Sequence, residues 1–185
     1  MNFEPTNLEV FLTKLIFRFF GKVVYKEYAD RLPLRGNESV LDFGCGMGTV
    51  AYYVSKRLTT GDLTCTDVSA KWLEVCQKTL RGCRDVSFIL GDIYKLPLQK
   101  KNFDLIYCHL VLHDISECEL VMVIPALSEL LKPHGLLVFR EPLDEANKLR
   151  SIHDLIVQNG FSKKDSRITD APLMDTTLEN IYMKY

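Results

Sequence analysis

Residues 40–49 read VLDFGCGMGT, and this stretch decides the fold. The apolar run at 40–43 is typical of a buried strand, and it leads directly into three alternating glycines, Gly44, Gly46 and Gly48. Glycine has no Cβ atom, so the backbone can turn tightly here and approach a bound molecule closely. A longer helical stretch follows. The pattern therefore predicts a strand, a ligand-binding loop and a helix, in that order.

Outward from this loop, the chain alternates short apolar runs with longer helical stretches. We expect strands at 40–43, 63–66, 86–90, 103–108 and 136–140, and helices at 49–58, 70–80, 117–131 and 145–159. Such alternation predicts βαβ units and a parallel sheet. Two more runs, 161–168 and 177–185, predict a closing pair of strands. The expected fold class is α/β, with a doubly wound sheet.

Residues 1–35 precede the alternating pattern and predict a helical cover. Apolar residues recur there at helical spacing, namely Leu8, Phe11, Leu12, Leu15, Ile16 and Phe19. They predict a helix with one apolar face that Gly21 ends, followed by a second helix at 22–31. The apolar face can pack over the domain, close over a hydrophobic substrate or meet a partner, and the sequence leaves all three roles open.

The whole chain has the size and composition of one globular domain. It has 185 residues, of which 47% are hydrophobic and 25% are charged, and domains usually have about 50 to 250 residues. We therefore expect a single domain over 1–185. The net charge of −1 indicates no general attraction to nucleic acid. The apolar run at 8–20 is interrupted by charges and too short to span a membrane.

Six cysteines are spread singly along the chain, without a CxxC pair. This spacing predicts neither a zinc site nor a redox motif, so we expect no bound metal. It also fits a reducing cytoplasm, and no signal-peptide pattern precedes the domain. The expected location is therefore cytoplasmic, and the oligomeric state stays open.

Three predicted strands end in or next to an acidic residue. Asp42 lies in the first strand, Asp67 follows the second and Asp92 follows the third. Because parallel strands present their carboxyl ends at one edge of the sheet, we expect these acids and the glycine loop to line one crevice. Asp42 can accept a hydrogen bond from an ammonium group, and Asp67 can accept two from the hydroxyls of a ribose.

The residues next to these acids suit an adenosine. Val68 can pack on an adenine ring, Asp92 can accept a bond from its amino group, and Ile93 can form an apolar wall. Other roles stay open, since Asp67 can also be a favourable charge at the start of a helix. The glycines can also form a purely structural turn. The spacing GxGxG departs from the GxGxxG of dinucleotide-binding proteins, which disfavours an NAD-dependent oxidoreductase.

As a set, five segments resemble the class I S-adenosylmethionine-dependent methyltransferases. The resemblance is to the broad group that includes methyltransferases of ubiquinone and menaquinone biosynthesis. The segments are VLDFGCGMG, the acid of CTDVS, GDIYKLPL, FDLIYCHLVLHDI and LLKPHGLLVFREP, which together cover about 37–142. The resemblance implies a seven-stranded, mostly parallel sheet with an antiparallel last strand. One departure is His134, where the family commonly has a second glycine.

The resemblance also implies S-adenosylmethionine as the cofactor. By position it places the cofactor on Asp42, Gly44, Cys45, Gly46, Gly48, Asp67, Val68, Asp92, Ile93 and His109. Asp42, Gly44, Gly46 and Gly48 would shape the methionine side of the pocket, with His109 touching the same part. The resemblance implies a small molecule as the methyl acceptor. A hydrophobic acceptor is compatible with the apolar first helix. The acceptor atom, whether oxygen, nitrogen or carbon, stays open.

The candidates for a general base are His109, His113 and Asp114, in the segment YCHLVLHDI after the fourth predicted strand. Histidine can accept a proton near neutral pH. His113 and Asp114 can instead cap and order the next loop. Methyl transfer depends mainly on holding the acceptor in line, so it does not require a base. The alternative function is a methyltransferase-like domain that holds the cofactor, or serves as a partner subunit, without transferring methyl.

Overall fold

The computed structural model describes residues 4–170 and 176–185. The chain forms two compact units, Met1–Asp92 and Ile93–Tyr185. Within the described ranges, no helix combines the length and the apolar character that crossing a bilayer requires.

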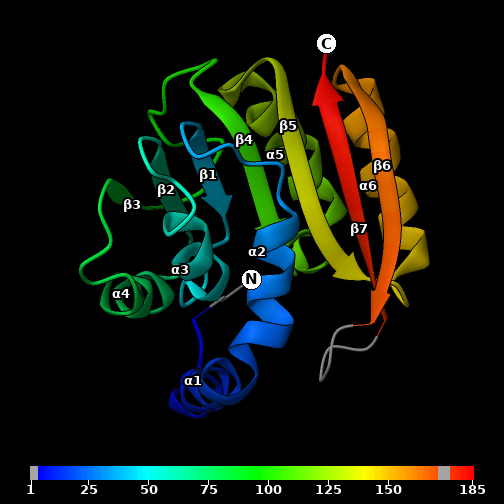
Figure 1. The fold of residues 1–185 in the computed structure, drawn as a ribbon. Helices are drawn as coiled ribbons and strands as arrows, with labels where there is room; N and C mark the ends of the chain where they lie inside the picture. The colour runs from blue at the N-terminus through cyan, green and yellow to red at the C-terminus, as the bar shows by residue number, and fades with distance from the viewer. Residues whose placement is uncertain (1–3, 171–175) are drawn as a thin grey trace. The chain divides into compact units, whose positions relative to one another are not determined.

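Three parallel strands form the sheet of the first unit, and they lie side by side in Figure 1. They are β1 (Ser39–Phe43), β2 (Asp62–Asp67) and β3 (Val86–Leu90), with β2 paired to both others. Most side chains of β1 and β2 are buried, as expected for parallel strands that are covered on both faces. The first three predicted strands are therefore confirmed.

Two helices connect these strands. They are α3 (Thr49–Ser55) and α4 (Ala70–Thr79). α3 follows Gly48 and ends three residues before the predicted 58. α4 is capped by Ser69, whose hydroxyl accepts a hydrogen bond from the Trp72 N–H at 3.0 Å. Such a cap satisfies one of the four N–H groups that a helix leaves without partners at its start.

The N-terminal cover is one continuous helical run. It consists of α1 (Asn7–Gly21), a π-helical turn η1 (Lys22–Lys26) and α2 (Glu27–Arg31). α1 ends at the predicted residue, but the prediction that Gly21 stops the helical backbone is wrong, because its φ is −55°. A Cβ atom at Gly21 would lie 3.0 Å from the Phe17 ring and 3.1 Å from the Tyr53 hydroxyl. Glycine therefore allows close packing at this point.

The face of α1 that packs on the first unit is not the predicted one. Val10 forms a buried cluster with Met47 and Val75, and Phe17 packs against it. The predicted apolar face is instead 42–66% exposed at Leu8, Phe11, Leu12, Leu15 and Phe19. Of the three open roles, Val10 and Phe17 carry the packing over the domain, so the exposed side chains are left with the other two roles.

Four strands form the sheet of the second unit. They are β4 (Phe103–His109), β5 (Leu131–Pro142), β6 (Phe161–Asp170) and β7 (Thr176–Lys184). β4 and β5 are parallel, whereas β7 runs antiparallel to both β5 and β6. The closing pair and the reversed last strand are therefore confirmed. β5 starts five residues before the predicted 136.

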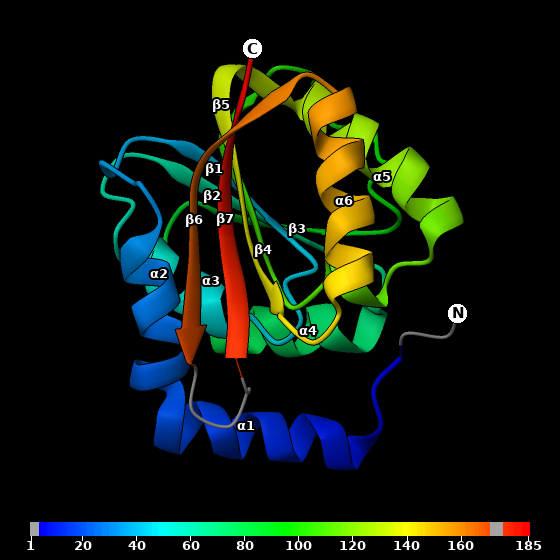
Figure 2. The ribbon, with the colours of Figure 1, turned by 90° about the vertical axis from the view of Figure 1, so that its right-hand side faces the viewer.

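The helices of the second unit are a short 3-10 turn η2 (Leu112–Asp114), α5 (Glu117–Leu130) and α6 (Ala146–Gln158). α5 starts with a reciprocal cap in which the Glu119 N–H donates to Ser116 Oγ and the Ser116 N–H donates to the Glu119 carboxylate, both at 3.3 Å. α5 and α6 pack on each other, as Figure 2 shows.

The seven strands have the order β3-β2-β1-β4-β5-β7-β6. Strand numbers fall from β3 to β1 and then rise, which is the reversal that defines a doubly wound sheet. The predicted α/β class, the strand number and the mostly parallel sheet are confirmed.

Candidate cofactor site and proton acceptor

The loop after β1 is bent by three glycines in the left-handed region. The φ angles of Gly44, Gly46 and Gly48 are 72°, 52° and 77°, which residues with a Cβ atom rarely adopt. The N–H groups of Gly44 and Cys45 both donate to the Thr66 carbonyl oxygen at 2.9 Å. These bonds fix the loop to β2.

Two of these glycines have different surroundings. A Cβ atom at Gly48 would lie 2.7 Å from the Sγ atom of Cys76, so Gly48 allows α4 to approach the loop. A Cβ atom at Gly46 would meet no atom within 4 Å. The backbone at Gly46 therefore faces open space that a side chain would fill. This arrangement fits a ligand that lies directly against the peptide.

Asp67 joins the glycine loop to the start of α4. Its Oδ2 atom accepts from the Gly46 N–H at 2.8 Å, and its Oδ1 atom accepts from the Ser69 N–H at 2.9 Å. Burial raises the pKa of Asp67, although the bonds from Ser69 and Gly46 oppose the rise. A carboxylate oxygen has two acceptor directions, so each can still accept from a ligand hydroxyl. Both roles foreseen for Asp67, ligand acceptor and helix-start charge, are compatible with this geometry.

The other two strand-end acids lie at the same edge of the sheet. Asp42 is buried near the end of β1, and Asp92 is partly buried, two residues beyond β3. Val68 is 44% exposed, so an apolar side chain next to Asp67 is available for an adenine ring. Ile93 is buried. Contact of these four residues with the cofactor stays a prediction.

Glu4 is a polar residue of this region that sequence reasoning missed. Its carboxylate accepts from Ser69 Oγ and the Ala70 N–H, both at 2.9 Å, and from the Lys71 N–H at 3.3 Å. A negative charge at a helix N-terminus is also favoured by the helix dipole. The sequence has no local signal for this contact, because Glu4 and Ser69 are 65 residues apart.

Three thiols that are separate in sequence lie together in the first unit. The Sγ atoms of Cys45, Cys65 and Cys76 are buried and within 4.8 Å of one another. Hydrogen bonds with Cys45 and Cys65 lower the pKa of Cys76 to about 5. Hydrogen bonds with Cys65 and Cys76, together with burial, raise the pKa of Cys45. Thiolates are ligands that soft metal ions prefer. The spacing of the cysteines in the sequence does not predict this cluster, because each cysteine comes from a different element.

In the second unit, the buried carboxylate of Glu141 organises the turn η2. Its Oε1 atom accepts from the N–H groups of Val111 at 3.0 Å and Leu112 at 2.8 Å. Its Oε2 atom accepts from the His113 N–H at 3.3 Å and lies 2.6 Å from Nδ1 of the same histidine. Glu141 lies in a segment that carries the family resemblance, but its contacts with the turn have no local signal in the sequence.

The pairing with Glu141 makes His113 a suitable proton acceptor. The bond to this carboxylate raises the pKa of His113 more than burial lowers it, and the charge of Asp114 adds to the rise. With Nδ1–H donated to Glu141, Nε2 is the ring atom that can take up a proton. Nε2 lies 3.4 Å from Asp114 Oδ1, and the side chain is 20% exposed. The alternative role of ordering the turn is also compatible with these contacts.

His109, at the end of β4, has a different environment. Burial and the nearby positive charge of Arg140 lower its pKa to about 3, so the ring is neutral near pH 7. A buried ring of such low basicity is a weaker base than His113. Its contact with the cofactor stays a prediction.

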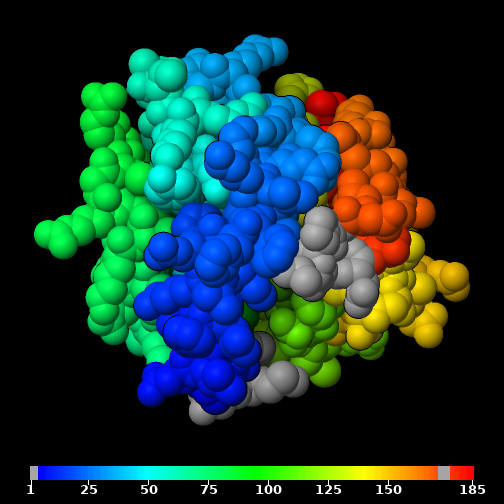
Figure 3. Space-filling model, turned by 60° about the horizontal axis from the view of Figure 1, so that its bottom comes forward, coloured from blue at the N-terminus to red at the C-terminus, as the bar shows by residue number. Residues whose placement is uncertain are grey.

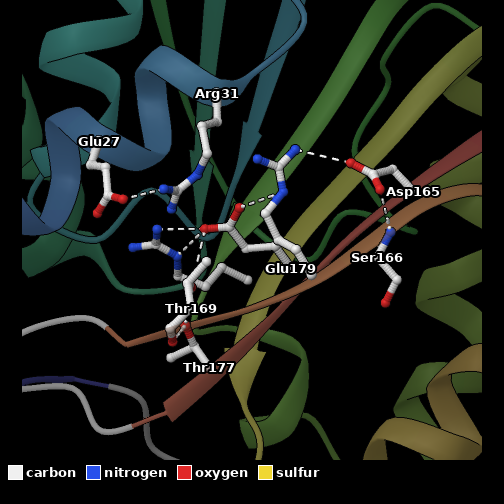
Figure 4. Close-up of polar contacts among 9 residues, drawn as sticks. Glu27, Arg31, Asp165, Ser166, Thr169, Thr177 and Glu179 are labelled. Atoms are coloured by element: carbon white, nitrogen blue, oxygen red, sulfur yellow. Dashed lines mark hydrogen bonds and ion pairs between the residues drawn. The ribbon is translucent and has the colours of Figure 1, made fainter.

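A buried ion pair holds β5 to β7. The Nε atom of Arg140 donates to Glu179 Oε1 at 2.7 Å, and both side chains are buried. Arg167 and Thr169, on β6, also approach the Glu179 carboxylate, at 3.7 and 3.5 Å. Figure 4 shows Glu179 with its partners on the neighbouring strands. This network stabilises the strands of the second unit.

The chain is similar in sequence to curated methyltransferases. A malonyl-(acyl-carrier protein) O-methyltransferase of Marinomonas sp. is 30% identical over 121 residues, which are 65% of this chain and 44% of that protein. A demethylmenaquinone methyltransferase of Thermotoga maritima is 32% identical over 111 residues, 60% of this chain and 46% of that protein. The chain thus spans less than half the length of either curated relative.

The fold is also that of a solved methyltransferase. A SAM-dependent methyltransferase from Aquifex aeolicus aligns with a TM-score of 0.78 and 18% identity, over 95% of this chain and 98% of that one. The family model described as "Methyltransferase domain" matches residues 40–135. This match covers more than half of the chain and contains the glycine loop and all three strand-end acids. The chain therefore belongs to the methyltransferase domain family.

Proposed function

We propose that this chain is an S-adenosylmethionine-dependent methyltransferase whose acceptor is a small molecule that must lose a proton. The observation that carries the proposal is the contact between Asp67 and Gly46. In this contact, a carboxylate that can accept from hydroxyl groups lies next to a peptide that has open space above it. The residues present therefore fit both the ribose and the amino-acid part of the cofactor.

The first unit supplies the groups that would hold the cofactor. Asp67 would accept from the ribose hydroxyls, and the exposed side chain of Val68 would cover the adenine. The loop at Gly44, Gly46 and Gly48 would lie against the methionine part, with Asp42 accepting from its ammonium group. Charge-assisted bonds of this kind contribute about 1.5–3 kcal/mol each.

The candidate proton acceptor is His113. When bound, S-adenosylmethionine provides a methyl group on a positively charged sulfur, so the cofactor itself makes the methyl transferable. Nε2 of His113 would take the proton that the acceptor loses on methylation. Glu141 would hold the ring in the required tautomer and stabilise its charged form, as the acid does in a carboxylate–histidine pair.

This pair favours one class of acceptor. A carboxyl group has an ordinary pKa of about 4 and is already ionised at pH 7, so its methylation needs no base. A phenol-like hydroxyl has a pKa of about 10, so its methylation benefits from one. We therefore infer a hydroxyl or enol acceptor. Malonyl-(acyl-carrier protein), named for one curated relative, is the test compound with a carboxyl group, and a small phenol is the test compound with a hydroxyl group.

The proposal is tested by binding and transfer measured separately. Calorimetry should show binding of S-adenosylhomocysteine, the cofactor product that remains after the methyl group has left. A labelled methyl group should pass from the cofactor to the hydroxyl-bearing acceptor and not to the carboxylate. His113→Asn should bind the cofactor product normally but transfer slowly. Absence of binding would refute the cofactor assignment. Binding without transfer to any compound of a metabolite extract would instead favour a domain that holds the cofactor without turnover.

We also propose a reducing compartment, such as the cytoplasm, as the working environment. No disulfide joins the six cysteines, all of which lie within the described ranges. Disulfides are rare where glutathione and thioredoxin keep thiols reduced. The three clustered thiols would remain reduced under the same conditions.

A further inference from the structure

The outer surface of α1 and of the following turn is strongly apolar. Seven large hydrophobic side chains within 16 residues are more than 40% exposed, namely Leu8, Phe11, Leu12, Leu15, Phe19, Phe20 and Val23. They make up half of the exposed large hydrophobic residues in the described part of the chain. Figure 3 shows this N-terminal segment, in dark blue, at the surface of the molecule. Contiguous apolar patches on a protein surface usually mark an interaction site.

These side chains lie on the side of α1 that faces away from the first unit. Leu12 and Phe19 follow Leu8 by four and eleven residues, which places all three on one face of a helix with 3.6 residues per turn. Val10 and Phe17 lie on the opposite face and pack against the cluster on the first unit. The helix is thus attached by one apolar face and presents a second one to the surroundings.

One edge of the outer face is basic. Lys14 and Arg18 are one helical turn apart and exposed, and Lys22 continues the row. The single acidic residue of α1 is Glu9, whose carboxylate accepts a hydrogen bond from the Thr6 N–H at 2.5 Å. The outer face therefore combines apolar side chains with a local positive charge, although the whole chain has a net charge of −1.

We propose that this surface, the α1 outer face defined by the seven side chains above and the basic row, binds the surface of a membrane that contains anionic lipids. A helix that lies in the membrane interface buries an apolar face at the boundary of the acyl chains and keeps basic residues at its rim. Lysine and arginine stems reach outward to the phosphates while their methylene groups stay against apolar surface. Such a helix does not need the length of a spanning segment.

The charge pattern favours a lipid surface over a second copy of the chain. A second copy would bring the same basic row and only one acid per α1 to the interface. An anionic bilayer instead attracts each of Lys14, Arg18 and Lys22, with a contribution that falls as salt is added. This inference concerns only the first unit, and it does not depend on the proposed methyl transfer.

The test uses the whole chain and vesicles of two compositions. We expect the protein to float with vesicles of phosphatidylcholine and phosphatidylglycerol, and to bind vesicles of phosphatidylcholine alone at least tenfold more weakly. Lys14→Gln with Arg18→Gln should lower binding to the anionic vesicles by roughly 10- to 30-fold, the size expected for two surface cations. Added salt should weaken wild-type binding in the same direction.

A matched pair of variants tests the apolar part. Phe11→Ser with Phe19→Ser should abolish vesicle binding. Val121→Ser with Met122→Ser should leave vesicle binding unchanged. This control also removes two exposed apolar side chains, 54% and 42% exposed, but they lie on α5 and not on the α1 outer face. Circular dichroism and cofactor-product binding should be the same in both variants, since all four side chains are exposed.

Three outcomes would overturn the proposal. The first is absence of wild-type binding to anionic vesicles. The second is equal binding to both vesicle types, which would remove the role of the basic row. The third is a wild-type dimer, seen by light scattering, that the Phe11/Phe19 variant dissociates, which would assign the surface to self-association. None of these results would affect the binding of the cofactor, which is measured without lipid.

Discussion

The Oδ2 atom of Asp67, at the end of β2, accepts a hydrogen bond from the Gly46 N–H in the loop after β1, at a distance of 2.8 Å. The other oxygen of the same carboxylate holds the Ser69 N–H at the start of α4, at 2.9 Å. One side chain therefore fixes the position of the loop and of the next helix. It can at the same time accept from a bound ribose.

Asp67→Asn keeps the size of this side chain but removes its charge. We expect the affinity for S-adenosylhomocysteine to fall by about 1.5–3 kcal/mol, because charged acceptors form the stronger hydrogen bonds. Titration calorimetry measures this difference. Asp62→Asn, at the exposed opposite end of the same strand, is the matched control and should bind normally. Unchanged affinity in a folded Asp67→Asn variant would show that this carboxylate does not touch the ligand.

Burial raises the pKa of Asp67 above its ordinary value of 3.8. Ligand hydroxyls need the ionised carboxylate as acceptor. As the pH is lowered, the affinity for the cofactor product should therefore start to fall at a higher pH than it would if Asp67 had the ordinary pKa. For folding the sign is opposite: a raised carboxyl pKa favours the folded state at low pH, and that contribution is lost as the pH rises through the folded-state pKa. Affinity measured from about pH 4 to 7 should show this fall in the wild type and lose it in Asp67→Asn.

Gly46 should respond to substitution through the ligand rather than through folding. Gly46 and Gly82 both have positive φ, 52° and 88°, and a Cβ atom at either would meet nothing within 4 Å. Alanine at either position should therefore cost a similar amount of stability, about 1–2 kcal/mol. Only Gly46→Ala should weaken cofactor-product binding, by at least about tenfold, and Gly46→Val should abolish it. Equal binding by the Gly46 and Gly82 variants would place the ligand elsewhere.

The sequence predicted the fold around the glycine loop well because the signals there are local. A strand, a glycine-rich loop and a helix follow one another within 40–58, and parallel strands necessarily bring their carboxyl ends to one edge. The pairing of β2 with β1 and β3 thus made the convergence of Asp42, Asp67 and Asp92 predictable. The same topology brings Asp67 close to the loop that contains Gly46.

The features that the sequence did not predict depend on contacts between distant segments. Glu4 reaches the start of α4 across 65 residues, and Cys45, Cys65 and Cys76 come from a loop, a strand and a helix. Helical spacing located the apolar residues of α1, but it cannot tell which of two apolar faces meets the protein. In the structure, Val10 and Phe17 pack inward and the larger apolar face is exposed. That choice is made by packing alone.

The buried pair of Arg140 and Glu179 should matter for stability. Glu179→Gln would leave the buried guanidinium without its counter-charge, which typically costs about 3–5 kcal/mol. We expect a loss of this size in the free energy of unfolding, measured by urea denaturation. Glu74→Gln is the control, because Glu74 pairs with Lys78 in the open, with the two side chains 63% and 69% exposed, and such pairs contribute about 0–1 kcal/mol. Equal losses in the two variants would contradict the prediction.

Mutation of His113 should separate proton transfer from cofactor binding. His113→Asn should lower kcat by about 10²- to 10⁴-fold, the usual contribution of a general base, with little change in affinity for S-adenosylhomocysteine. His153→Asn is the matched control, since His153 pairs with Tyr182 at 2.7 Å, away from Glu141. An undiminished kcat in the His113 variant would leave this residue only the role of ordering the turn.

The pH profile distinguishes a base from a structural residue. His113 must be neutral to accept a proton, so kcat/KM should fall as the pH drops through its pKa, which Glu141 raises above the ordinary 6.5. Glu141→Gln removes the main cause of the rise, and the acidic limb should then move to lower pH. For folding, a raised histidine pKa stabilises the native state below the unfolded-state pKa, and this contribution is lost as the pH rises through the folded-state pKa. Stability and activity should therefore change in opposite directions with pH. If Glu141→Gln did not move the acidic limb of the kcat/KM profile, His113 would be excluded as the titrating base.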